Sequence, residues 1–260
     1  MILTTELPQE LLQALREAPL RLNAMRSALL AANLEGVWWG LRPATLVDRA
    51  TLDLETARLL GETLKAKQPH LFVAFEPSSE QTFVINRTLL RQRLEEEIAW
   101  IDVGGTVPKL LDGAPPCVLD LLSLLAAHPA SDPLCLLRGT GEEPAPSSLI
   151  GLAGFLLDYA AAYVVGDEGR NCLGERMLQL VEAYLITANG QRNNLLAFSY
   201  PDELASSATG STDLTPSAVA ARLETILQER FSTAQSQFRE LAGFRLEVMY
   251  STVCLDQVAL

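Results

Sequence analysis

The sequence has very little histidine and a shortage of basic residues. Two histidines occur in 260 residues, and 20 Lys and Arg stand against 32 Asp and Glu, which gives a net charge of −12. A protein that binds nucleic acid mainly through phosphate contacts needs a basic surface, and this composition does not supply one. The two histidines also lack the HxxxH or HxH spacing of a histidine-rich metal site. We therefore expect neither nucleic acid nor a metal ion as a ligand.

Cysteine is scarce as well. Its spacing matches neither a pair of CxxC zinc motifs nor a small disulfide framework. The N-terminus begins with Met1, Ile2 and Leu3 but lacks the basic segment and long apolar stretch of a signal peptide. We expect reduced thiols and an intracellular, cytoplasmic protein. The four cysteines are Cys117, Cys135, Cys172 and Cys254.

Long hydrophobic runs are limited to one stretch, from Ser147 to Gly166. It contains a single charged residue, Asp158, near its middle. An aspartate at the centre of a membrane span costs about 3 kcal/mol on insertion scales. The stretch therefore predicts a buried helix followed by a buried strand, and no membrane span.

Apolar side chains are plentiful, at 48% of the residues with 20% charged, so the chain can build a globular core. Hydrophobic periodicity and turn signals predict helices and strands that interleave along the chain. Helices are expected over 7–15, 22–30, 54–67, 87–97, 116–128 and 149–157, and from Pro216 to about Phe231. Strands are expected over 37–39, 45–47, 71–75, 82–85, 98–102, 133–137, 161–165, 177–187, 195–200, 244–248 and 253–260.

Two of these expectations have strong local signals. Asp53 is a candidate N-cap for the helix over 54–67, and Asn189-Gly190 is the hairpin dipeptide between two long strands. Because hairpins interrupt the alternation of helix and strand, we expect a mixed α/β fold with a central, partly antiparallel sheet and helices packed on it. The chain is interpreted as one domain over 1–260, with the Gly-, Glu- and Pro-rich loop 138–147 as the candidate subdomain boundary.

A glycine turn follows the predicted strand 98–102. Asp102, Gly104, Gly105 and Thr106 can bring backbone amides close to a phosphate group. The string resembles the first phosphate loop of sugar kinases in the actin-like ATPase superfamily, where the loop joins two strands of a hairpin. In this chain Pro108 disfavours a paired strand directly after the turn. A strand that simply ends in a Gly-Gly turn is the alternative.

Cys172 is a candidate nucleophile. It lies in a predicted loop beside Asn171, and His128 or His70 would have to supply the base. A buried structural thiol is the alternative, since free cysteine is among the most buried residue types. His128 also precedes Pro129 at the end of a predicted helix, where a histidine suits the helix dipole. No motif indicates a particular cofactor.

The second half of the chain resembles an uncharacterised family, typified by open reading frame seventy-four of human chromosome one. The residues that carry the resemblance are Gly154-Phe155-Leu156-Leu157, Tyr159, Tyr163, Asn171-Cys172-Leu173, Ala197-Phe198-Ser199-Tyr200-Pro201 and Val258-Ala259-Leu260. The family pattern continues with Gly-Tyr-Pro after Phe-Leu-Leu, whereas this chain has Asp158, Tyr159 and Ala160. The resemblance implies an intracellular protein without an established activity, so it assigns no catalytic residues.

These observations favour a soluble, non-catalytic interaction or adaptor protein whose partner is another protein. A cysteine-dependent hydrolase or transferase that uses Cys172, Asn171 and a histidine is the first alternative. A nucleotide-binding enzyme that uses the turn Asp102–Thr106 is the second. Mixed α/β folds host all three kinds of function, so the fold class does not decide among them.

Overall fold

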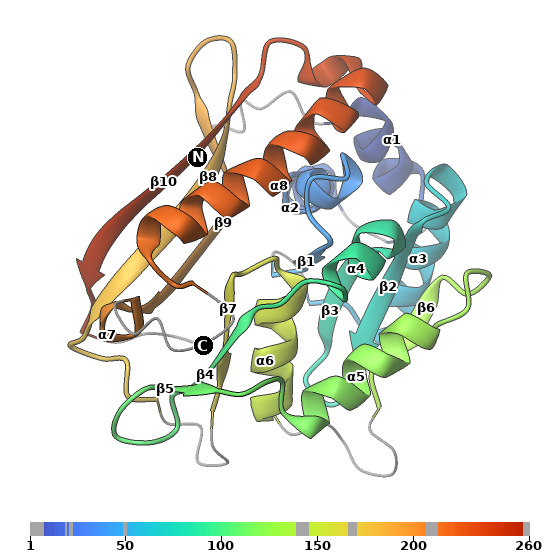
Figure 1. Ribbon diagram of the computed structural model, residues 1–260. Coiled ribbons are helices and arrows are strands. Elements are labelled where there is room, and N and C mark those ends of the chain that lie inside the picture. Colours follow the sequence, from blue (N-terminus) through green and yellow to red (C-terminus); the bar gives the residue numbers. More distant parts are fainter. Residues whose placement is uncertain are drawn as a thin grey trace. The chain divides into compact units, whose positions relative to one another are not determined.

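The structure is a computed structural model that describes residues 8–18, 20, 23–48, 51–138, 146–165, 171–205 and 213–256. Helices and strands interleave, and the sheets contain both parallel and antiparallel pairs (Figure 1). The predicted mixed α/β class is therefore confirmed. The described strands belong to three sheets rather than to one central sheet.

The chain divides into two compact units, and each is assembled from three stretches. The first unit comprises Met1–Glu95, Asp120–Glu143 and Ala234–Glu240, and the second comprises Glu96–Leu119, Pro144–Thr233 and Leu241–Leu260. The predicted boundary loop 138–147 lies mostly outside the described residues. The interpretation of 1–260 as a single domain stays a prediction.

The first unit is built around a four-stranded mixed sheet in the order β1-β3-β2-β6. β2 and β3 form the predicted hairpin, β1 pairs antiparallel with β3, and β6 pairs parallel with β2. Almost every residue of β2 and β3 is buried, which fits their continuous apolar sequence. The strands are β1 (Ala44–Leu46), β2 (Leu71–Glu76), β3 (Gln81–Asn86) and β6 (Leu134–Leu136).

Local side-chain signals determine one helix start and one helix end in the first unit. The Asp53 side chain accepts a hydrogen bond from the Thr56 backbone N–H at 2.7 Å, which confirms the predicted N-cap of α3. The helix α4 ends at Arg93, earlier than expected, because Glu95–Glu97 would put negative charge at a helix C-terminus. The helices are α1 (Gln9–Glu17), α2 (Ala24–Trp38), α3 (Leu54–Lys67) and α4 (Arg87–Arg93).

The predicted strand over 37–39 is wrong. Val37 and Trp38 form the last turn of α2, because they extend the buried helical stripe of Leu30 and Leu34 by the same three- and four-residue steps. The helix ends at Trp38, and Gly40, two residues later, has a positive φ of 69°, a backbone conformation that favours glycine. The sequence Val37-Trp38-Trp39 is misleading because valine and tryptophan are also common in strands.

The second unit contains a three-stranded mixed sheet in the order β5-β4-β7. β4 pairs antiparallel with β5 and parallel with β7. Gly154 of α6 faces Ala162 of β7 closely, since an added Cβ would lie 3.0 Å from the Ala162 Cβ. The apolar stretch from Ser147 therefore forms the predicted helix and strand. The elements are β4 (Ala99–Asp102), β5 (Lys109–Leu111), α6 (Pro146–Leu156) and β7 (Ala161–Val164).

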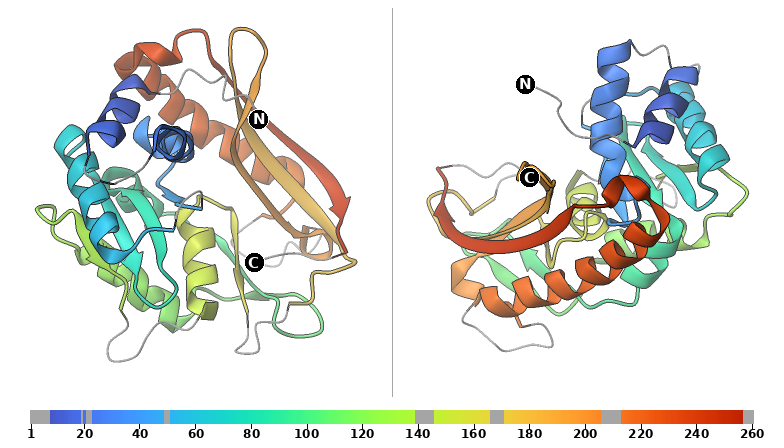
Figure 2. Two further views of the ribbon diagram at one scale, coloured as in Figure 1. Left: turned by 180° about the vertical axis from the view of Figure 1, so that it is seen from behind. Right: turned by 90° about the horizontal axis from the view of Figure 1, so that it is seen from above.

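A second sheet of this unit is antiparallel, in the order β10-β8-β9. The β8–β9 hairpin turns at the predicted Asn189-Gly190, where Gly190 has a φ of 83°. The three strands form a long curved ribbon, with β10 at one edge (Figure 2). Its strands are β8 (Met177–Ile186), β9 (Arg192–Pro201) and β10 (Arg245–Cys254).

Four further helices complete the described chain. α5 and α8 each contribute residues to both units, and α8 begins at the predicted Pro216. Figure 1 shows α8 running along the sheet of β8, β9 and β10. These helices are α5 (Pro116–Ala127), α7 (Asp202–Ala205), α8 (Pro216–Gln237) and the 3₁₀ helix η1 (Arg239–Leu241).

Candidate functional site

The glycine turn after β4 lies inside a hairpin. Asp102 is opposite Lys109 in the β4–β5 pair, so residues 103–108 connect the two strands. Pro108 disfavours pairing at its own position, and it lies outside the β4–β5 ladder. β5 begins one residue after Pro108 and is only three residues long, so the missing backbone donor of proline falls outside the ladder.

The turn is held by its own aspartate. The Asp102 Oδ1 atom accepts a hydrogen bond from the backbone N–H of Gly104 at 2.9 Å, and Gly104, Gly105 and Thr106 are exposed. This is a side-chain turn of the kind that aspartate commonly makes two residues ahead. The backbone N–H of Gly104, which a phosphate-binding loop would direct at its ligand, is therefore engaged by a carboxylate.

The loop that carries Cys172 packs against this turn. The backbone N–H of Cys172 donates to the Val103 carbonyl oxygen at 3.0 Å. Asn171 accepts through Oδ1 from the Leu173 N–H at 3.1 Å, so its side chain shapes its own loop. The structure thus brings Asn171 and Cys172 together with the Asp102–Thr106 turn, although residues 107–170 of the sequence lie between them.

Arg176 joins the two loops, and sequence reasoning did not select it. Its Nε donates to the Cys172 carbonyl at 2.6 Å, one terminal nitrogen donates to the Thr106 carbonyl at 2.7 Å, and the other contacts Glu203 at 2.8 Å. A guanidinium presents such donors in a fixed plane. No local signal could identify this role, because two of its partners lie 70 and 27 residues away.

The thiol of Cys172 is half-buried, and its surroundings do not favour the thiolate. Burial raises its pKa above 9.0, and Arg176 offsets only part of this while Glu203 and Asp102 act with burial. A nucleophilic cysteine usually has a depressed pKa beside a cation or an imidazole. The environment of Cys172 therefore keeps it mainly in the thiol form near neutral pH.

His128, the predicted base, belongs to the first unit, whereas Cys172 belongs to the second. Its ring lies 5.0 Å from that of Phe72, and Nε2 lies 3.2 Å from the Asp132 carbonyl oxygen. Arg87 donates to the carbonyl oxygens of His128 at 2.5 Å and of Pro129 at 3.1 Å. The ring of His128 thus contacts a carbonyl group beyond the end of α5 and caps none of the helix carbonyls in the described contacts, and its pairing with Cys172 stays a prediction.

A buried ion pair also lies in the second unit. Asp158 is 3% exposed, and its Oδ2 atom lies 2.5 Å from Nη1 of Arg230, whose Nη2 is 3.7 Å from Glu96. Asp158 is therefore paired in the interior and does not face solvent. Asp158 has a φ of 70°, a conformation that glycine adopts without strain. The ion pair offsets part of that strain.

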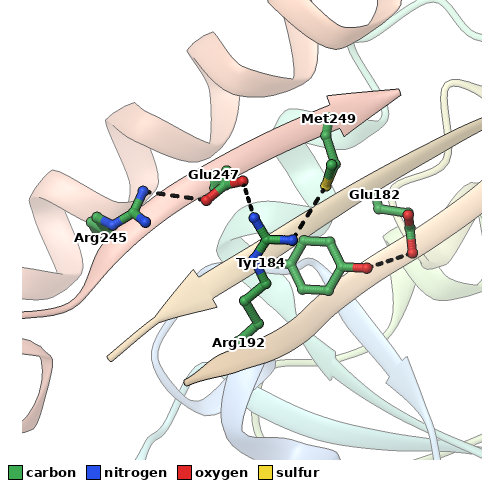
Figure 3. A network of polar contacts seen from close by, with 6 residues as sticks. All are labelled: Glu182, Tyr184, Arg192, Arg245, Glu247 and Met249. Atoms are coloured by element: carbon green, nitrogen blue, oxygen red, sulfur yellow. Dashed lines mark hydrogen bonds and ion pairs between the residues drawn. The ribbon is translucent and has the colours of Figure 1, made fainter. Parts of the chain in front are cut away.

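Polar side chains link the three strands of the β10-β8-β9 sheet on one face (Figure 3). Arg192 contacts Glu247 at 2.7 Å and lies over the Tyr184 ring, 5.6 Å from its centroid. Arg245 also contacts Glu247, at 3.2 Å, and Tyr184 donates to Glu182 at 2.6 Å. Each charged head in this network has a partner, so the network fastens the strands and is not itself a vacant binding site.

Two general findings bear on ligands. Within the described ranges, no three His, Cys, Asp or Glu side chains gather closely enough to hold a metal ion. None of the described helices combines the length and the apolar character needed to cross a membrane.

The family resemblance of the second half stays a prediction. Comparison of the chain with protein-family models, with curated proteins and with solved structures finds no match.

Proposed function

We propose that the chain is a non-catalytic interaction module that binds another protein through the outer edge of β10. The observation that carries this proposal is the exposure of large apolar side chains on that strand. Tyr250 is 52% exposed and Met249 is 36% exposed, and they point to opposite faces of the sheet because they are neighbours in a strand.

Apolar exposure continues at the C-terminal end of this edge. Leu255 directly follows β10, and Met177 lies opposite Cys254 at the start of β8; both are more than 40% exposed. Single exposed apolar residues are ordinary on a protein surface, but several of them along one strand edge favour an interaction surface. The exposed apolar residues on or beside this edge are Met177, Met249, Tyr250 and Leu255.

The backbone of β10 supplies the second requirement. In the described part of the chain, β8 is the only strand that pairs with β10, so the other side of β10 presents unpaired N–H and C=O groups. Proteins usually protect such an edge with lysine, proline or a bulge. From Val248 to Cys254 this strand contains no charged residue and no proline. An extended segment of a partner can therefore add to the sheet.

The test compares three immobilised proteins: the unaltered chain, Tyr250→Lys, and Gln228→Lys as a control with the same charge change on the exposed side of α8. Proteins retained from an extract of its own source are identified by mass spectrometry, and each is then purified and titrated by calorimetry. We expect a partner that binds the chain and the control but loses at least about tenfold in affinity for Tyr250→Lys. Equal binding by all three would show that the β10 edge is not the binding surface.

A cysteine-dependent hydrolase or transferase remains the second proposal, because Cys172 adjoins the Asp102–Thr106 turn. The raised pKa predicts slow reaction of Cys172 with iodoacetamide at pH 7.5, slower than at the exposed Cys117. Peptide mass spectrometry measures the order of modification. Fast labelling at Cys172 that disappears in Cys172→Ser would instead support the enzyme.

Nucleotide binding at Asp102, Gly104, Gly105 and Thr106 is the third proposal, supported by the hairpin that carries this turn. Saturating Mg-ATP should raise the melting temperature of a protein that binds it. A shift that is lost in Gly105→Val, with unchanged stability in the absence of ATP, would support this proposal. The absence of a shift at millimolar Mg-ATP would contradict it.

A further inference from the structure

We infer that the occupant of the β10 edge is a second copy of this chain, paired antiparallel through β10 about a two-fold axis. The inference rests on the proposed function and names its partner. It depends on three properties of the edge: its accessibility, the register that symmetry imposes, and the charges at its two ends.

Among the described residues, no strand or side chain hydrogen-bonds to the outer side of β10, whereas the outer side of β9 has one such contact. At the opposite edge, the hydroxyl group of Tyr163 donates a hydrogen bond of 2.7 Å to the Ser199 carbonyl oxygen of β9. β10 has no such cover, and it extends over ten residues. This length exceeds that of a typical strand, so two copies of β10 can form a long ladder.

Symmetry fixes the register. Residues directly opposite each other in an antiparallel pair point to the same face, and a two-fold axis perpendicular to the sheet relates identical residues. One residue must therefore face itself across the axis. The register that overlaps the whole of Arg245–Leu255 places Tyr250 opposite Tyr250 of the second copy and Met249 opposite Ser251 of the second copy. It also covers the exposed side chains of Met249 and Tyr250.

The charges at the two ends of the edge are complementary in this arrangement. Arg245, whose side chain is 66% exposed, lies at one end, and the exposed Asp256 lies just beyond the other. Antiparallel pairing brings Arg245 of each copy toward Asp256 of the other. No like charges face each other along the strand, because Glu247 is opposite Val253 of the second copy.

The net charge predicts how salt affects the pairing. Each copy carries −12, so the two repel each other at long range, and added salt screens this repulsion. Self-association should therefore strengthen as the salt concentration rises. A cationic partner on the same edge would show the opposite dependence.

Sedimentation velocity of the full chain, from micromolar to sub-millimolar concentration and at two salt concentrations, tests the inference. We expect a monomer–dimer equilibrium that strengthens with salt, persists in Gln228→Lys, and weakens about tenfold or more in Tyr250→Lys. Hydrogen exchange of the backbone amides of Arg245–Cys254 should become slower as the protein concentration rises. We expect this in the unaltered chain and in Gln228→Lys, but not in Tyr250→Lys. A dimer that is unaffected by Tyr250→Lys would overturn the inference.

Disulfide trapping tests the register. In a chain with Cys117→Ser and Cys254→Ser, Tyr250→Cys should form a cross-linked dimer on mild oxidation, and Thr252→Cys should form far less, because Thr252 faces Val248 of the second copy. Equal cross-linking by both variants would contradict this register. The two proposals can also be told apart. If the chain stays monomeric under all conditions and Tyr250→Lys loses a different protein partner, the second copy is not the occupant, but the proposed function stands.

Discussion

Among single residues, Glu35 in α2 couples the stability of the first unit to pH. Burial raises the pKa of its carboxyl group from 4.5 to about 7, and its buried Oε2 atom has no hydrogen-bond partner among the described residues. The folded chain therefore retains a proton that the unfolded chain releases. This contribution to stability is complete below pH 4.5 and is lost as the pH rises toward 7.

Replacement of Glu35 by glutamine should remove this dependence. The free energy of unfolding of Glu35→Gln, relative to the unaltered chain, should increase by up to about 3 kcal/mol between pH 4.5 and 7.5, because a pKa unit corresponds to about 1.4 kcal/mol. Urea unfolding at a series of pH values measures the difference. A difference that does not change with pH would mean that Glu35 ionises in the folded chain as it does in water.

Arg176 is the second residue with a specific consequence. Arg176→Met leaves the carbonyl groups of Cys172 and Thr106 without their donor, and we expect a loss of about 2 kcal/mol in the free energy of unfolding. Hydrogen exchange in residues 103–108 should become faster. Arg176→Lys keeps the charge but not the planar set of donors, so it should restore only part of the loss. Unchanged exchange in that loop would contradict the role assigned to Arg176.

At the scale of elements, the contact between α3 and the residue before β6 is unusually close. A Cβ at Gly61 would overlap the carbonyl oxygen of Pro133, which is backbone and cannot swing aside. Gly61→Ala should therefore lower the free energy of unfolding by about 2 kcal/mol or more, although alanine is the better helix former by about 1 kcal/mol. Gly113→Ala, at a position with open space around it, should change stability by less than about 0.5 kcal/mol. Chemical denaturation of both variants would show the contrast, and a stabilised Gly61→Ala would rule out the close approach.

Elements with a local chemical signal could be predicted from the sequence. The cap at Asp53 and the turn at Asn189-Gly190 need only neighbouring residues to form, and the structure confirms both. The end of α2 at Trp38 and the short strand β5 could not be predicted in the same way. Their conformations depend on burial and on pairing with distant residues, which residue composition does not encode.

The candidate site was predictable in parts but not as a whole. The residue types of Asp102–Thr106 and of Asn171-Cys172 marked two separate loops, and nothing in the sequence indicated that they lie together. The hydrogen bond from Cys172 to Val103 and the contacts of Arg176 with Thr106 and Glu203 join residues far apart in the chain. Such contacts follow from the pairing of β4 with β7, which is a long-range feature.

For the whole molecule, the charge makes a further prediction. With 20 basic and 32 acidic residues, the chain should not bind duplex DNA or single-stranded RNA at physiological salt, because it lacks a surplus of cations to replace the counterions of the phosphates. Fluorescence anisotropy with labelled oligonucleotides measures this directly. Binding that weakens steeply with salt would contradict this prediction and would indicate a local basic surface on a chain of negative net charge.

The interleaved course of the chain has a consequence for its synthesis. The first unit takes residues from Met1–Glu95, from Asp120–Glu143 and again from Ala234–Glu240, so its last component is made only after Pro144–Thr233 of the second unit. Domains made from one continuous stretch can fold as they emerge, N-terminal part first. Here the early helices and strands of the first unit stay incompletely assembled until Ala234–Glu240 has been made. The nascent chain should therefore be a client of ribosome-associated chaperones, and truncations before Glu240 should degrade rather than yield a stable fragment.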